Sequence, residues 1–144
     1  MEELIFDRTQ EDVTNKTDKG YHDINDLNRV EEWCGYIASL LNLYNYQVTI
    51  TTKTNWQYTD ARTVAQMERI RSNIALLRST YKNIPRDVIV PSSLSPIDID
   101  KANNIEKILY EIDKTISEME HYFIHSGVGR SGQSWNIQNY FRRE

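Results

Sequence analysis

The stretch that decides the fold is DIDKANNIEKILYEIDKTISEMEHYF, residues 98–123. Its apolar residues recur at spacings of three and four, at positions 105, 108, 109, 112, 116, 119 and 123. This period is that of one face of an α-helix. About 26 residues rising about 1.5 Å each give a rod about 39 Å long, comparable to the width of a small domain. We therefore expect the rest of the chain to pack along this helix.

Two further stretches, residues 25–42 and residues 63–81, show the same period. Their apolar stripes are Leu27, Val30, Trp33, Cys34, Ile37, Leu40 and Leu41 in the first, and Val64, Met67, Ile70, Ile74, Leu77 and Tyr81 in the second. Thr63 and Gln66 have the spacing of a capping box, and Asp98 is placed to cap the third helix. Each amphipathic helix needs a partner for its apolar face. The sequence therefore predicts a mainly α fold, a three-helix bundle.

The chain ends carry different composition from the helices. We expect an irregular N-terminal arm over residues 1–24 with a short helical turn near residues 9–13, and a helical domain over residues 25–124. Residues 125–144 hold three glycines within six positions, which helices do not tolerate, followed by several aromatics. This C-terminal segment is predicted to be an irregular Gly/aromatic tail.

A small extended or β element is expected between the first two long helices. Residues 47–53, QVTITTK, alternate Val and Ile with Thr, as half-buried strands do. A lone strand needs a neighbour, and residues 4–6 or residues 87–90 could supply one.

Charge and cysteine content narrow the function classes. The net charge of −4 argues against a membrane-surface or nucleic-acid role for the whole molecule, because both partners are anionic. Residues 62–82 carry five bases and one acid, whereas residues 98–123 carry seven acids and three lysines. Helices of opposite sign are expected to be packing neighbours. Cys34 is alone, so no intrachain disulfide forms, and no run approaches the ~18 apolar residues of a membrane span.

No pattern for catalysis, metal binding or cofactor binding rises above background. His121 and His125 have the spacing of a shared zinc, but no third ligand accompanies them. The run GVGRSG has neither a preceding strand nor a following Lys-Ser/Thr, so it is not a phosphate loop. We therefore predict a protein that is not an enzyme, with no catalytic residues, no metal and no cofactor.

Several aromatic residues have no helical stripe to complete and are candidate interface residues. Trp56 and Tyr58 either close the end of the helical core or anchor a partner, and the plug interpretation is favoured for Trp56. The other candidates lie near the chain ends and are Phe6, Trp135, Tyr140, Phe141, Arg142 and Arg143. These ends either contact other copies and other proteins or fold back on their own helices.

Five short motifs recur together in a recognisable order: IFDRTQ, DLNRVE, TKTNW, QMERIRSN and ANNIEKIL. In this order the chain resembles a domain of uncharacterised phage and prophage proteins of Gram-positive bacteria, encoded among tail and baseplate components. The resemblance implies a structural component of a virion or tail-like particle, assembled in the bacterial cytoplasm. Its partners would be other tail or baseplate proteins and copies of itself, without a membrane.

A second function class stays open. A small nucleic-acid-binding regulatory protein would use the basic helix of residues 62–82, through Arg62, Arg69, Arg71 and Arg78. The acidic helix expected beside it would cancel that charge locally, so assembly is the favoured function and nucleic acid the less favoured partner.

Overall fold

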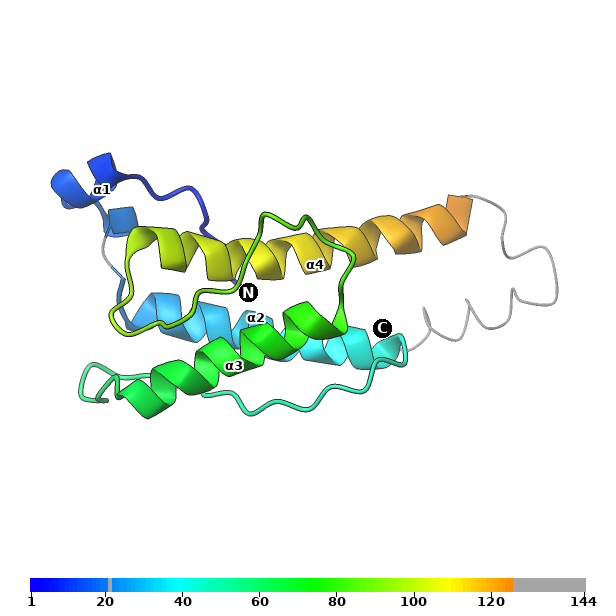
Figure 1. The fold of residues 1–144 in the computed structure, drawn as a ribbon, viewed down its shortest axis with the longest axis horizontal. Coiled ribbons are helices and arrows are strands. Elements are labelled where there is room, and N and C mark those ends of the chain that lie inside the picture. The colour runs from blue at the N-terminus through cyan, green and yellow to red at the C-terminus, as the bar shows by residue number, and fades with distance from the viewer. Residues whose placement is uncertain (21, 126–144) are drawn as a thin grey trace.

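The computed structural model describes residues 1–20 and 22–125, with side chains up to Met119. This part of the chain is mainly helical, as predicted. Its elements are α1 (Gln10–Thr14), the 3-10 turn η1 (Asp18–Gly20), α2 (Ile24–Leu43), α3 (Val64–Thr80) and α4 (Ile99–His125) (Figure 1). The three long helices begin and end within two residues of the predicted bounds.

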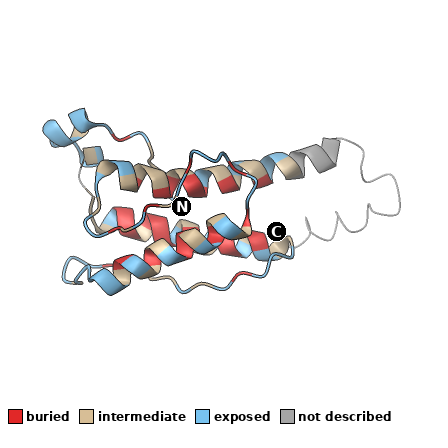
Figure 2. Cartoon of the chain, viewed as in Figure 1, coloured by how far each residue is buried: buried red, intermediate tan, exposed pale blue. Residues whose placement is uncertain are grey.

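The three long helices share one apolar core. Each of α2, α3 and α4 contacts the other two, so the basic and acidic helices are neighbours, as expected. Their buried positions face one another, whereas α1 has no buried residue (Figure 2). The predicted stripe of α4 is fully buried from Ile105 to Ile116. On α3 the expectation for Val64 is wrong: its side chain is 70% exposed, because the first helical residue lies beyond the end of the core.

Side-chain caps determine where the long helices begin. The Asp23 side chain accepts the N–H groups of Asn25 and Asp26, and the Asp26 carboxylate accepts the N–H of Asp23. Asp98 accepts the N–H of Lys101 at 2.8 Å, which confirms the predicted start of α4. The capping box predicted for Thr63 is half formed. Thr63 accepts the N–H of Gln66 at 3.2 Å, but the Gln66 side chain accepts a bond from Arg69.

The strand predicted at residues 47–53 is wrong for the described chain, which contains no strand. Helix side chains replace the expected partner strand. The Asn42 amide bonds both the N–H and the C=O of Val48 at 2.8 Å, and Asn73 donates to the carbonyl of Thr51 at 2.7 Å. The alternating pattern therefore predicted a strand where the backbone of Val48 and Thr51 bonds side chains of α2 and α3.

Candidate functional site

A buried group of four charges joins the N-terminal arm to α2 and α4. The Glu106 carboxylate on α4 is 0% exposed and accepts bonds from two arginines. Arg8 Nη2 lies 2.7 Å from Glu106 Oε2, and Arg29 Nε lies 2.7 Å from Glu106 Oε1. Asp26 accepts from both guanidinium groups, from Arg8 at 3.2 Å. We call Arg8, Asp26, Arg29 and Glu106 the arm cluster.

The arm cluster is electrically balanced, with two arginines and two carboxylates. Burial alone would raise the pKa of Asp26, but bonds from the Asp23 N–H and from Arg29 hold that pKa below its ordinary value. Burial likewise lowers the pKa of Arg29, and the bond to Glu106 more than offsets this, so the pKa of Arg29 is raised. Both shifts favour the ionised forms of Asp26 and Arg29, as a stable buried ion pair requires.

A second buried carboxylate, Glu31 on α2, links α3 to residues 47–56, which lie between α2 and α3 and are called the extended segment below. Its oxygens accept from Arg69 Nη1 at 2.6 Å and Nη2 at 3.0 Å, from the Lys53 N–H at 2.8 Å, and from the Trp56 indole N–H. Glu31 is 1% exposed. We call Glu31, Lys53, Trp56 and Arg69 the Glu31 cluster. It holds the extended segment against the helices where a sheet was expected.

Residues 1–9 form the first part of the region predicted as an arm over residues 1–24; they are called the arm from here on, and they lie on the chain's own helices. Asn103 of α4 bonds both the N–H and the C=O of Arg8, at 3.1 and 2.9 Å. The Ile5 N–H donates to Glu106 Oε1 at 3.0 Å, and the ring centroids of Phe6 and Tyr110 are 4.7 Å apart. In this single chain the arm thus lies against its own α2 and α4.

Both clusters, and the contacts of the arm with Asn103, are formed by residues of the five motifs that carry the resemblance. IFDRTQ supplies Arg8, DLNRVE supplies residues 26, 29 and 31, TKTNW supplies Lys53 and Trp56, QMERIRSN supplies Arg69, and ANNIEKIL supplies Asn103 and Glu106. Sequence reasoning missed these roles. The available signal was Glu106 next to Ile105 on the apolar stripe of α4, where a solvated carboxylate would not be expected.

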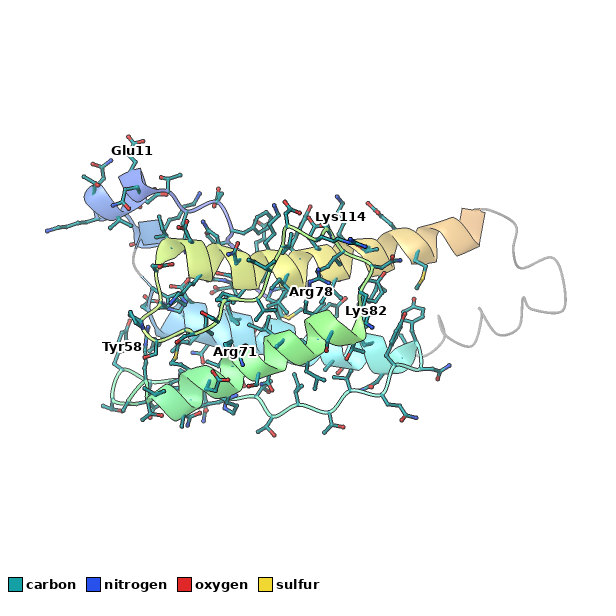
Figure 3. All side chains as sticks on the ribbon, in the orientation of Figure 1. Glu11, Tyr58, Arg71, Arg78, Lys82 and Lys114 are labelled. Carbon is teal, nitrogen blue, oxygen red and sulfur yellow. The ribbon has the colours of Figure 1, made fainter. Side chains whose placement is uncertain are left out.

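The candidate interface residues fall into different environments. Trp56 is 3% exposed, as the plug interpretation requires, whereas Tyr58 is 80% exposed at one end of the molecule (Figure 3). Phe6 packs on Tyr110. The remaining candidates, which are Trp135, Tyr140, Phe141, Arg142 and Arg143, lie outside the described residues, as do the side chains of His121 and His125.

The basic helix has its arginines engaged within the chain. Arg62 donates to the carbonyl of His22 at 3.1 Å, and Arg69 belongs to the Glu31 cluster. Arg71 pairs with Glu68 at 2.6 Å, and Arg78 donates to the carbonyl of Val88 at 3.2 Å (Figure 3). Glu31 and Glu68 therefore offset the charges of Arg69 and Arg71, whereas Arg62 and Arg78 donate to neutral carbonyls and keep their charge.

A cavity of about 260 Å³ separates residues 10–20 from the beginning of α4. It is lined by residues such as Val13 and Lys19 on one side and Ile97 and Ala102 on the other. His22 also lines it, and burial lowers the pKa of His22 to about 4.

The described part of the chain contains neither a metal-binding group of side chains nor a helix that could span a membrane. No three His, Cys, Asp or Glu side chains there are grouped so that they could hold a metal ion. None of the helices described is long and apolar enough to cross a membrane. Cys34 is buried, and burial raises the pKa of its thiol.

The comparisons with known proteins place the chain in no group. No family model matches it, and neither a curated protein nor a solved structure matches it.

Proposed function

We propose that this protein is a non-enzymatic structural component of a phage tail or baseplate, or of a tail-like particle, and that it acts through protein–protein contacts. In this proposal α2, α3 and α4 form a three-helix bundle, braced by the extended segment and the arm. The protein is assembled in the bacterial cytoplasm and resides in the particle, where its partners are other tail proteins and copies of itself.

The observation that carries the proposal is the exposure of Tyr58 and Val64 at one end of a braced core. Tyr58 is 80% exposed and Val64 is 70% exposed, and both flank the loop that leads into α3. Tyrosine is enriched among the residues that anchor protein interfaces, and the exposed Val64 adds apolar area at the start of α3. The motifs that carry the resemblance to tail-associated proteins build the bracing, which supports a role that depends on shape.

The buried charges support assembly over catalysis. In the described part of the chain, Arg8, Asp26, Arg29, Glu31 and Glu106 are the buried charged residues, and each is paired with a side chain of opposite charge. A reactive site would instead keep such a group accessible to substrate. The engaged arginines of α3 weigh in the same way against the nucleic-acid alternative.

Particle incorporation tests the proposal. Particles from a strain that encodes the protein would be purified on a density gradient, and the tagged chain would be located by immunogold electron microscopy. We expect the tag on the tail or baseplate. Absence from particles, together with salt-sensitive DNA binding in a mobility-shift assay, would establish the regulatory alternative.

Surface variants make the test specific. A chain carrying both Tyr58→Ser and Val64→Ser should keep its thermal unfolding temperature and lose incorporation, because both side chains are exposed. Ile89→Ser is the matched control, since Ile89 is 61% exposed on a different loop. Equal incorporation of both variants would remove this end of the molecule from the contact.

A further inference from the structure

We propose that residues 1–9 exchange between copies of the chain, so that the arm of one copy binds to α2 and α4 of another. We call the surface that holds the arm the seat; it is formed by Asp26, Arg29 and Trp33 of α2 and by Asn103, Glu106 and Tyr110 of α4. Each copy would then contribute Arg8 to the arm cluster of its neighbour. This inference deepens the proposed assembly function by naming a second copy as partner.

The seat holds the arm in the way that a groove binds an extended peptide. Side chains of the helices form hydrogen bonds with the backbone of the arm. The Asn103 amide accepts the N–H of Arg8 and donates to its carbonyl, and Glu106 accepts the N–H of Ile5. Trp33 Nε1 donates to the Glu2 carbonyl at 2.9 Å. Phe6 and Arg8 then supply ring packing and charge. Backbone bonds give affinity and the side chains give selectivity, as in peptide recognition generally.

An empty seat would lack the Arg8 guanidinium that balances its buried carboxylates. Without Arg8, the carboxylates of Asp26 and Glu106 share the single guanidinium of Arg29, which leaves a net negative charge in a buried position. Removing one partner from a buried ion cluster is strongly destabilising. An arm must therefore occupy the seat, and the arm of a second copy carries the same residues.

The connection between the arm and α2 forms a unit of its own. α1 packs on η1, the Thr17 N–H donates to the Asp12 carbonyl, and Lys19 pairs with Asp7 at 2.8 Å. This unit projects from the three long helices, with Glu11 pointing away from them (Figures 1 and 3). The cavity of about 260 Å³ lies between it and α4.

The start of α2 does not depend on the arm. Asp23 and Asp26 complete a capping box there by themselves, so the helix end stays satisfied when the arm changes seats. A closed form, in which each arm lies on its own chain, and an exchanged form, in which it lies on another copy, then contain the same contacts of the arm cluster. They differ mainly in the path of residues 10–20. Packing copies into a particle raises their effective concentration and favours the exchanged form.

Thiol cross-linking of full-length chains tests the exchange. A size-tagged Phe6→Cys chain is mixed with an untagged Tyr110→Cys chain and treated with a short bismaleimide. The control partner is Ile89→Cys, whose position is 61% exposed on a loop outside the proposed contact and therefore reports random collision. Cys34 is 1% exposed, and wild-type chain shows whether it reacts.

We expect at least about tenfold more tagged–untagged product from the Tyr110→Cys chain than from the Ile89→Cys chain. An excess of the peptide MEELIFDRT should abolish that difference, whereas the same peptide with Arg8→Glu should not. Equal products from the two partners, or a difference that neither peptide changes, would overturn the exchange. Particle incorporation is measured separately, so arm exchange can fail while the proposed function stands.

Discussion

The buried carboxylate of Glu106 on α4 lies 2.7 Å from the guanidinium of Arg8, a residue 98 positions earlier in the chain. Their side chains are 0% and 2% exposed. The pair ties the N-terminal arm to the middle of the helical core, and Arg29 bonds the other carboxylate oxygen. Because the pair is buried, its loss should lower the stability of the fold far more than the loss of a surface salt bridge would.

Glu106→Gln should destabilise the protein by about 3–5 kcal/mol, because Asp26 would then be the one buried carboxylate left to the two buried arginines. Urea unfolding followed by circular dichroism measures the loss. Glu118→Gln is the matched control, since Glu118 is exposed on the same helix and should change stability by less than about 0.5 kcal/mol. Equal midpoints for the two variants would contradict the arm cluster.

Arg69→Met should cost about 3 kcal/mol, the lower end of the range for a broken buried pair, because the Arg69 side chain is 23% exposed. Glu31 would keep its bonds from Lys53 and Trp56 but lose its balancing charge. Arg71→Met on the same helix should have little effect, since it breaks only an exposed pair with Glu68. Thermal melts that rank Arg71→Met as the worse variant would refute the Glu31 cluster.

Ile112→Asp should destabilise the protein by at least about 4 kcal/mol, because Ile112 is 0% exposed and the new carboxylate would have no partner. Lys114→Asp puts the same residue on the exposed face of α4 and serves as the control. A thermal melt unchanged by Ile112→Asp would remove α4 from the core.

Stability should fall as the pH is lowered from about 6.5 to about 4. Arg62 Nη1 lies 3.3 Å from Nδ1 of His22, so the neutral ring accepts there and carries its proton on Nε2. Burial lowers the folded-state pKa of His22 to about 4, below the ordinary 6.5, so the unfolded chain binds the proton first. The loss across this window is at most about 3 kcal/mol at 1.36 kcal/mol per pKa unit.

The control for this pH dependence is His22→Gln, which should flatten the urea midpoint between pH 6.5 and 4. The Asp26 contribution falls outside that window. Its folded-state pKa is depressed below 3.8, so its stabilisation persists above that pH and is lost as the pH falls further. A wild-type midpoint that is flat to pH 4 would show that His22 is accessible to solvent.

Local pattern was enough to predict the long helices. The period of three and four, the cap at Asp98 and the buried stripe on α4 involve residues within a few turns of one another, so they can be read without knowing the fold. The same locality explains the error at residues 47–53. Alternation requires an extended backbone, but which groups accept its hydrogen bonds depends on elements distant in sequence.

The sequence by itself therefore determined the mainly helical class, the bounds of α2, α3 and α4 to within two residues, and the burial of most of their apolar stripes, with Val64 an exception. Only the tertiary structure decided that Arg8 meets Glu106 and that Trp56 meets Glu31, across separations of 98 and 25 residues. The helical period shows which face of a helix is apolar. A charged residue on that face stands out in the sequence, but the period does not show which residue will pair with it. Its partner is set by how the arm, the extended segment and the helices pack, because buried charges are stable only where a second element brings the opposite charge within hydrogen-bond distance.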